Sequence, residues 1–283
     1  MKNESLSHKL NKAKENNFLL SSTIDNILEL SDCPNIPDWV LKSLEELLEE
    51  EHWEELNNRF YKSLAFGTGG MRGRTIGNFI TKAEQGKSPK GETPNYSAVG
   101  SNTLNEITLL RAIKALYLHT TQWLAGEGIL SQPRLVVAHD VRHFSRKFCK
   151  LVASAWTKLG GYALIFDGPR STPQLSFTVR HQYAHAGVVI TASHNPSHDN
   201  GFKAYFNQGA QLVEPNATGV INEVNAITSE AYDALPESKH GTLHVLSADM
   251  DRIYMDDAKS LLLRPDLMEG GDDKTKVVFT NLH

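Results

Sequence analysis

The clearest pattern of apolar and polar positions begins at Pro37. Over residues 37–66 apolar residues recur every three or four positions, which predicts an amphipathic helical stretch. The repeating positions are Val40, Leu41, Leu44, Leu47 and Leu48. The glutamates between them favour a solvated helix face, with a metal or protein docking site as the alternative. A surface loop is predicted at 82–97, and another helix from Asn102 to about Ala125.

From residue 135 onward, short apolar runs alternate with helical patterns. Strands are predicted at 135–138, 162–166 and 187–191, and helices at 145–159 and 172–185. This order, with near-continuous apolar strands, predicts an α/β architecture with a largely parallel sheet. The carboxyl ends of the strands then meet at one edge of the sheet, where ligands bind.

The two ends of the chain have weaker patterns. Residues 1–36 are polar, and we expect them to be only partly ordered. Residues 216–262 are predicted as mostly helical, with a looser stretch at 235–244 and a linker-like break at 264–276. Residues 277–283 predict a strand. Because a strand needs partners for its backbone groups, we expect the chain to be truncated here or completed by another element.

Composition and charge disfavour several classes of function. The chain has 283 residues, 40% hydrophobic and 22% charged, with a formal net charge of −4. These values are typical of a globular protein and offer no basic field for general nucleic-acid binding. We expect no membrane span and no signal peptide, because no apolar run is long enough. Cys33 and Cys149 form no paired motif, so a cytoplasmic protein is expected.

The segment Thr191–Pro196 is the strongest candidate for chemistry. It follows a predicted buried strand, and Asn195 with Pro196 favours a tight turn. The strand end would therefore present Ser193 beside a histidine and free backbone amides, which suits a nucleophilic or phosphorylated serine. Lys203 follows, a compact charge that binds phosphate and serves as acid or base when its pKa falls. The alternative is a turn in which the polar side chains only satisfy backbone groups.

Two further segments could bind an anion. In Gly67–Gly73 the glycines would let backbone amides approach a phosphate, with charge from Arg72 and Arg74. This segment matches neither the P-loop nor the dinucleotide-binding fingerprint. Asp140 and Arg142 follow the first predicted strand, and a structural ion pair is the simplest interpretation.

A Ser-His-Asp hydrolase is disfavoured. Ser193 and His194 are neighbours in sequence, so we expect their side chains to diverge rather than to form a bond between nucleophile and base. The G-x-S-x-G turn of such hydrolases is absent around Ser193.

Together these segments resemble the α-D-phosphohexomutase family, which contains phosphoglucomutases and phosphomannomutases. The matching pieces are, in order, FGTGGMRG (66–73), HDVRHFS (139–145), STPQ (171–174), TASHNP (191–196) and NGFKAYF (200–206). The resemblance runs from about residue 37 to residue 283. It implies a three-layer α/β/α domain I with a mainly parallel mixed sheet, preceded by an N-terminal helical extension.

The resemblance also implies a role for each motif. Ser193 would be the phosphoserine that donates its phosphoryl group to a hexose phosphate and takes one back from a hexose 1,6-bisphosphate, the intermediate and activator. His194, Lys203 and Arg72 would be the other catalytic residues. The residues implied in phosphate or substrate binding are Thr68, Gly69, Arg72, Asn195 and Lys203. The implied cofactor is Mg²⁺, for which this chain would supply only the phosphate on Ser193. Phosphoryl transfer needs positioning and charge stabilisation, which suits these residues.

Three parts of the family's pattern have no match in the sequence. They are the metal loop Asp-Gly-Asp-x-Asp-Arg, the sugar-recognition loop that distinguishes glucose from mannose, and the Arg-rich phosphate loop. Residues 247–252 (SADMDR) match the metal loop only in part, and polar capping of a helix start is the simpler interpretation. The resemblance divides the chain into an extension (1–36), domain I (37–265), and a linker with the first strand of a truncated second domain (266–283).

The sequence therefore predicts a mutase-type isomerase that moves phosphate between C1 and C6 of a hexose phosphate, of which this chain is an N-terminal portion, inactive alone. One alternative is a natural truncated protein that binds a phosphosugar or a partner without turnover. Another is a split enzyme whose second chain supplies the missing loops. The expected partners are a hexose phosphate and either the missing C-terminal domains or a protein that covers the exposed face, with neither nucleic acid nor membrane.

Overall fold

The computed structural model describes residues 2–34, 36–67, 69–227, 236–268, 276 and 278–280, with side chains from residue 6 onward. In this part of the chain six strands form one sheet, in the order β1-β5-β4-β2-β3-β6. The strands are β1 (Gly70–Arg74), β2 (Arg134–His139), β3 (Tyr162–Phe166), β4 (Ala186–Ile190), β5 (Asp199–Phe206) and β6 (Leu243–Leu246). β4, β2, β3 and β6 are parallel, whereas β5 runs antiparallel to β4 and β1. The mainly parallel mixed sheet is confirmed.

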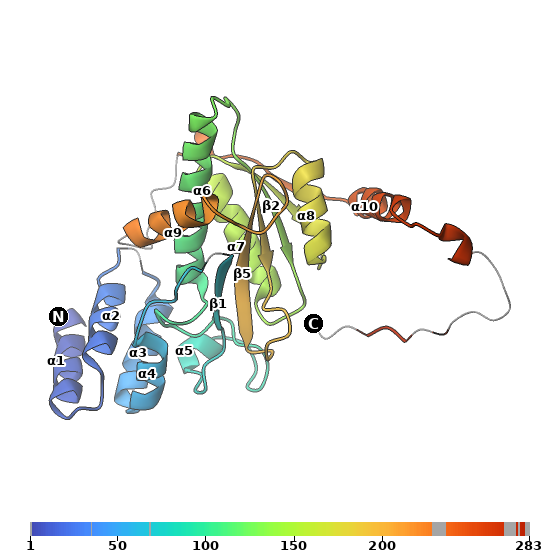
Figure 1. Cartoon of the computed structure of the whole chain (residues 1–283). Helices are drawn as coiled ribbons and strands as arrows, with labels where there is room; N and C mark the ends of the chain where they lie inside the picture. Colours follow the sequence, from blue (N-terminus) through green and yellow to red (C-terminus); the bar gives the residue numbers. More distant parts are fainter. Residues whose placement is uncertain are drawn as a thin grey trace.

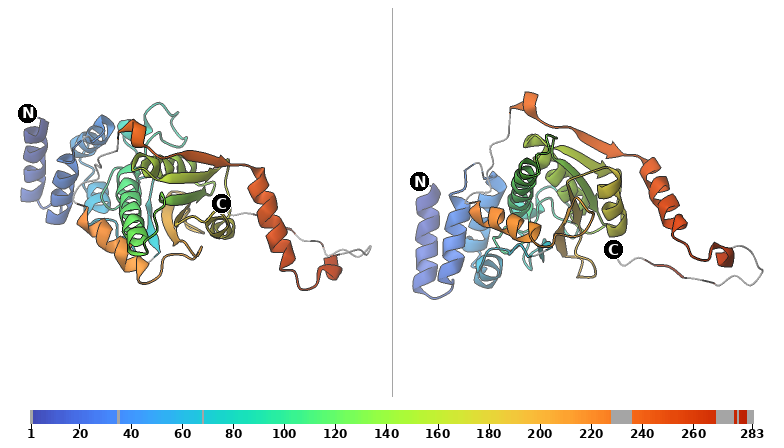
Figure 2. Two further views of the ribbon diagram at one scale, coloured as in Figure 1. Left: turned by 90° about the horizontal axis from the view of Figure 1, so that it is seen from above. Right: turned by 45° about the horizontal axis from the view of Figure 1, so that its top comes forward.

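Helices cover both faces of this sheet (Figures 1 and 2). One face carries α6 (Glu106–Gly126), α7 (Ser145–Lys158) and α9 (Asn216–Ala226), and the other carries α8 (Thr172–His181) with α10 (Ala248–Ser260) beside it. On β2, Val137 packs in the core below α6 and α7, and Val136 packs in the core below α8. A strand buried on both faces is apolar at consecutive positions, which explains the run at 135–138.

The predicted helices and strands in the middle of the chain are confirmed to within a few residues. The helix expected from Asn102 begins at Glu106, because the side chain of Asn105 accepts hydrogen bonds from the backbone N–H groups of Ile107 and Thr108. The loop expected at 82–97 begins with one short helix, α5 (Lys82–Gln85).

Three strands were not predicted. β1 contains two glycines and two arginines, and only Met71 in it is buried, so it lacks an apolar run. β5 begins with Asp, Asn and Gly, which usually mark turns. β6 overlaps the end of the looser stretch expected at 235–244 and continues into residues predicted to be helical, so that prediction is wrong at 245–246. Leu243 and Val245 face solvent at the sheet edge. β1 and β6 are the edge strands, where burial imposes a weaker pattern, whereas β5 is mostly buried and only its polar start obscured it.

Residues 1–36 differ from the expectation of partial order. They contain α1 (Lys2–Glu15) and α2 (Ser21–Ser31), which precede α3 (Asp38–Glu49) and α4 (Trp53–Phe60). Leu6, Leu10 and Ala13 recur at helical spacing and lie in a second core together with residues of α2, α3 and α4. The apolar stripe is narrow and most other positions are polar, which hid the helices in the sequence.

The side chain of Asn57 in α4 forms hydrogen bonds with residues at the start of α2. Its side-chain oxygen accepts hydrogen bonds from the Leu20 backbone N–H at 3.0 Å and the Thr23 hydroxyl at 2.9 Å. Its amide nitrogen donates to the Phe18 carbonyl at 2.9 Å. These bonds satisfy backbone groups at a helix start that has no cap of its own.

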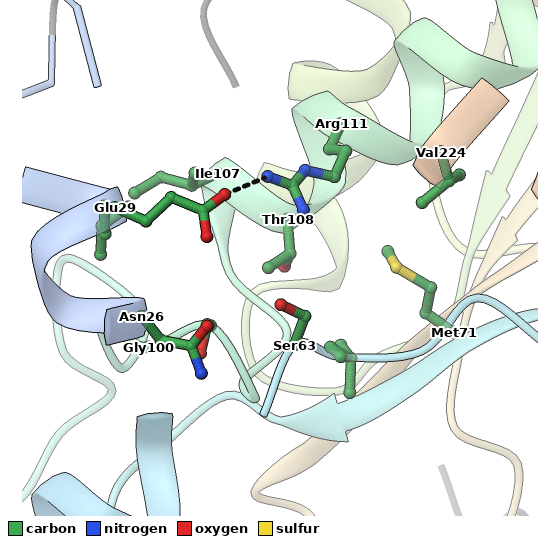
Figure 3. Close-up of a pocket in the computed structure, with 12 residues that line it drawn as sticks. Asn26, Glu29, Ser63, Met71, Gly100, Ile107, Thr108, Arg111 and Val224 are labelled. Atoms are coloured by element: carbon green, nitrogen blue, oxygen red, sulfur yellow. Dashed lines mark ion pairs between the residues drawn. The ribbon is translucent and has the colours of Figure 1, made fainter. Parts of the chain in front are cut away.

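The N-terminal helices meet the α/β/α unit at a small cavity (Figure 3). Glu29 of α2 and Arg111 of α6 face each other at 3.8 Å. Met71 of β1 and Val224 of α9 also line the cavity. Its volume of about 40 Å³ has room for only a few water molecules. This cavity therefore marks the contact between the N-terminal helices and the α/β/α unit, and it is too small for a substrate.

The C-terminal expectations are only partly covered by the structure. Of the strand expected at 277–283, residues 278–280 are described and have no regular secondary structure, while the others lie outside the described residues. The expected break at 264–276 begins with a short turn of 3₁₀-helix, Pro265–Met268. In the described parts of the chain, no helix has the length and apolar character needed to cross a membrane.

A buried charge cluster joins α4 to α5. The Arg59 side chain is only 2% exposed, and it donates to Glu55 at 2.7 Å and to Glu84 at 2.5 Å. Glu84 also accepts a hydrogen bond from the Val99 backbone N–H. Burial alone would lower the pKa of Arg59, but the two carboxylates outweigh it and raise that pKa. The cation is thus fully compensated inside the protein.

Replacing Arg59 with Met should lower the free energy of unfolding by about 3–5 kcal/mol, because two buried carboxylates lose their partner. Urea unfolding followed by circular dichroism measures this loss. The matched control is Lys9→Met, which breaks an exposed pair with Glu49 and should cost about 1 kcal/mol or less. Equal losses in the two variants would contradict the role of the buried cluster.

Candidate active site

The loop after β4 presents Ser193 to solvent. The backbone of Ser193 has a φ of 59°, and its side chain is exposed. Its N–H donates to the Thr191 hydroxyl at 3.1 Å, and the Asn195 N–H donates to the Ala192 carbonyl at 3.2 Å. A left-handed conformation is uncommon for a residue with a side chain. The loop therefore holds a mildly strained turn that points the serine away from the sheet.

Arg142 clamps this loop from inside the protein. Its buried guanidinium donates to the carbonyls of Pro196 at 2.7 Å and Asp199 at 3.1 Å through Nη1. Through Nη2 it donates to the carbonyls of Ser193 at 2.8 Å and Asn195 at 2.6 Å. One side chain thus satisfies four carbonyls of the loop, and the loop keeps its shape only while that cation is in place.

Asp140 holds Arg142 in this position. One oxygen of Asp140 accepts the Arg142 backbone N–H at 3.0 Å and the Ser145 hydroxyl at 2.6 Å. The other lies 3.3 Å from Nε of Arg142. The ion pair interpreted from the sequence is confirmed, and its structural role is to support the serine loop.

Two cations lie on the neighbouring strands β1 and β5, and one of them reaches this loop. Arg72 of β1 lies opposite Gly201 of β5, and its Nη1 donates to the Asn195 side-chain oxygen at 3.1 Å. Lys203 of β5 lies opposite Gly70 of β1 and is half-buried. Burial and the Arg72 charge lower the pKa of Lys203, while Asp140 acts in the opposite direction. The structure thus joins Arg72 to Asn195, and it places Lys203 near enough to Arg72 and Asp140 for their charges to affect its pKa.

The glycine segment has a clear packing role. Gly70 has a φ of 129°, and a Cβ there would lie 1.9 Å from the Phe202 carbonyl oxygen. The Gly69 carbonyl accepts hydrogen bonds from the Ala204 N–H and the Gln211 side chain, both at 3.1 Å. The glycines therefore let β1 approach β5. Phosphate binding by Gly69 stays a prediction, and Thr68 lies outside the described residues.

His194 does not diverge from Ser193 as we expected. Its Nδ1 lies 3.3 Å from Oγ of Ser193, within hydrogen-bond distance. The exposed loop leaves both side chains room to turn toward each other. Among the described residues no carboxylate holds the other ring nitrogen, so the third member of a hydrolase triad is lacking there.

Sequence analysis missed part of the lining of the site. A hollow of about 700 Å³ in front of Ser193 and His194 is also lined by Arg170, Ser171 and Thr172. Ser171 caps α8, accepting from the Gln174 backbone N–H, so the positive end of this helix lies at the hollow. The sequence contained the STPQ motif of the family at 171–174, but its residues by themselves indicated only the start of a helix after a strand.

The partial metal loop at 247–252 is structural. The side chain of Ser247 accepts a hydrogen bond from the Asp249 backbone N–H and so caps α10, as the sequence predicted. Asp251 accepts hydrogen bonds from Arg170 at 2.6 and 2.7 Å and from Gln174 at 2.6 Å. The bonds from Arg170 lower the pKa of Asp251. This carboxylate therefore ties α10 to α8. In the described part of the chain no group of three or more His, Cys, Asp or Glu side chains is placed to hold a metal.

Comparisons with known proteins agree with this fold. Residues 97–231 match the family described as phosphoglucomutase/phosphomannomutase, alpha/beta/alpha domain I. A phosphoglucomutase of Staphylococcus saprophyticus is 31% identical over 254 residues, which cover 88% of this chain and 39% of the relative. A phosphopentomutase of Homo sapiens is 28% identical over 252 residues, covering 86% and 37%.

A solved structure from Thermus thermophilus, assigned as a phosphomannomutase, shares the fold. It aligns with a TM-score of 0.52 and 25% identity over 71% of this chain and 36% of its own. The sheet, the serine loop and these relatives agree, and the chain belongs to the α-D-phosphohexomutase family. It spans 37% and 39% of the length of the two curated relatives.

Replacing Arg142 with Met should release the serine loop, because four carbonyls lose their donor and Asp140 loses its partner. Amide hydrogen exchange at 193–199 should accelerate, and the free energy of unfolding should fall by about 3–5 kcal/mol. Arg146→Met, at an exposed position on α7, is the control and should change neither. Loop exchange that stays equal to that of the parent protein would refute the clamp.

Replacing Arg72 with Gln should raise the pKa of Lys203 toward its ordinary value, because the protonated amine loses a repelling neighbour. Titration of the Lys203 side chain by NMR measures the shift. Arg74→Gln removes a neighbouring cation of the same strand that does not contribute to the pKa of Lys203, and it should leave that pKa nearly unchanged. A Lys203 pKa that is the same with and without Arg72 would contradict the coupling.

Proposed function

We propose that this chain is the phosphoserine-bearing domain of a mutase that moves a phosphoryl group between C1 and C6 of a hexose phosphate. The observation that supports this most directly is the Ser193 loop. Its hydroxyl is exposed at the strand ends, the loop is fixed by Arg142, and Arg72 reaches it from β1. A site for phosphoryl transfer needs this combination of a positioned oxygen and fixed positive charge.

In the proposed reaction Ser193 carries a phosphoryl group before substrate binds. The phosphorus forms a bond to a hydroxyl oxygen of the hexose phosphate while its bond to Oγ of Ser193 breaks, and Oγ takes up a proton from His194, which lies 3.3 Å away. The hydroxyl proton passes to a base, for which we propose Lys203, since its lowered pKa makes the neutral amine more accessible. The resulting hexose 1,6-bisphosphate then returns its other phosphoryl group to Ser193, and the sugar oxygen that leaves takes the proton held by Lys203.

Two side chains assist these steps in the proposal. His194, 3.3 Å from Oγ of Ser193, takes the serine proton when the serine is phosphorylated again. Arg72 and Asn195, already joined to each other at 3.1 Å, bind oxygens of the transferred phosphoryl group. In the proposal Thr68 and Gly69 also take part in phosphate binding.

In the proposal Mg²⁺ binds this chain through a phosphate on Ser193. Among the described residues, no group of three or more His, Cys, Asp or Glu side chains is placed to hold a metal ion. Mg²⁺ takes octahedral oxygen ligands, so the other protein ligands would come from residues outside the described part. When bound, the ion would supply positive charge to the transferred phosphoryl group.

The proposal also concerns the rest of the protein. Residues 37–265 would form domain I, after the extension 1–36, and residues 266–283 would lead into a second domain. Segments beyond this chain, or a partner, would cover the open side of the hollow and contact the sugar. The proposed setting is the cytoplasm, where cysteine thiols stay reduced.

Ser193→Ala in the whole protein should abolish conversion of glucose 1-phosphate to glucose 6-phosphate, because no phosphoryl carrier remains. Mass spectrometry of the parent protein should locate a phosphate on Ser193. The matched control is Ser197→Ala, another exposed serine of the same loop, which should keep activity. Normal turnover in Ser193→Ala would exclude this serine as the phosphoryl carrier.

A further inference from the structure

A second hollow lies between α4 and the edge strand β1, and its lining does not include Ser193. Its volume is about 540 Å³. Its polar lining consists of the cations Lys62, Arg72 and Arg74, the amides Asn58, Asn78 and Asn102, the hydroxyl of Thr103, and the ion pair of Arg59 with Glu55. The proposed function uses only Arg72 from this set.

The three cations lack carboxylate partners. Arg72 donates to the Asn195 side chain, Arg74 donates through Nε to the Ile76 carbonyl at 2.7 Å, and Lys62 lies 5.0 Å from the Tyr61 ring centroid. Within the described ranges, no Asp or Glu lies within ion-pair distance of any of them. The buried Arg59 beside them is different, because two carboxylates neutralise it. The hollow therefore carries uncompensated positive charge.

The strand geometry points these charges the same way. Arg72 and Arg74 are two residues apart on β1, so their side chains leave the same face about 7 Å apart. Asp199 of β5 lies opposite Arg74 in the register. Its carboxylate accepts from Asn195 at 2.9 Å and lies 3.5 Å from His198, so it is already engaged. The positive charges of Arg72 and Arg74 therefore remain available to bind an anion.

The remaining lining suits a hydroxylated ligand. Asn58 and Asn78 are exposed, and the side-chain oxygen of Asn102 is available while its nitrogen donates to the Asn58 carbonyl at 3.1 Å. Amides both donate to and accept from hydroxyl groups. Leu64 and Ala65 form an apolar part of the lining of the hollow. We propose that this hollow is a second binding site for a sugar monophosphate, with the phosphate on Lys62, Arg72 and Arg74 and the sugar hydroxyls on the asparagines.

The test uses the 283-residue chain, with glucose 1-phosphate, inorganic phosphate and glucose as probes. Isothermal titration should show glucose 1-phosphate binding more tightly than inorganic phosphate, with no binding of glucose. In the double variant Lys62→Gln/Arg74→Gln the affinity should fall about tenfold or more. NMR should show the side-chain amides of Asn58 and Asn78 shifting when glucose 1-phosphate is added.

The control is Lys87→Gln/Lys90→Gln, which removes two exposed lysines of another loop and should keep the affinity. Ser193→Ala should also keep it, so a failure of the proposed phosphoryl transfer and a failure of this site are distinguishable. An unchanged affinity in Lys62→Gln/Arg74→Gln would overturn the site. Equal affinity for inorganic phosphate and glucose 1-phosphate would overturn its assignment to a sugar.

Discussion

One buried guanidinium determines the shape of the candidate active site. The carbonyls of the serine loop converge on Arg142, and they could not be satisfied by each other in that arrangement. A buried cation without partners would cost several kcal/mol. Here the carbonyl dipoles and Asp140 compensate it, and in return the cation fixes the left-handed turn at Ser193. The nucleophile candidate is therefore held by a residue that lies far away in sequence and makes no contact with solvent.

The antiparallel edge of the sheet gives the site its charge. In a parallel sheet only the carboxyl ends of the strands meet at the site. Here β5 runs antiparallel to β4, starting beside the serine loop, and then pairs with β1. This arrangement places Lys203 and Arg72 on one face of the sheet beside the Asn195 loop. The same edge strand continues to Arg74 and the second hollow. Both candidate phosphate sites thus depend on one five-residue strand.

The sequence predicted the centre of the fold better than its edges. Strands β2, β3 and β4 are buried on both faces, so their apolar runs were visible. β1, β5 and β6 were missed because they carry Gly, Arg, Asn or exposed apolar residues. The motif at Ser193 was located by its position after a buried strand. The contact between His194 and Ser193 was wrongly excluded, because side-chain rotation in an exposed loop cannot be inferred from sequence adjacency. The clamp by Arg142 joins residues more than fifty positions apart, and no local pattern encodes such a contact.

Gly70 has no functional group, yet it lies where β1 approaches β5 too closely for a side chain, since a Cβ there would lie 1.9 Å from the Phe202 carbonyl oxygen. Any side chain there would meet the Phe202 carbonyl and force β1 away from β5, which would carry Arg72 away from Asn195. In a population of natural or laboratory variants, Gly70 should therefore tolerate as little change as the residues that perform chemistry. The arrangement of this site therefore depends on the lack of a Cβ atom at residue 70 as much as on the side chains that are present.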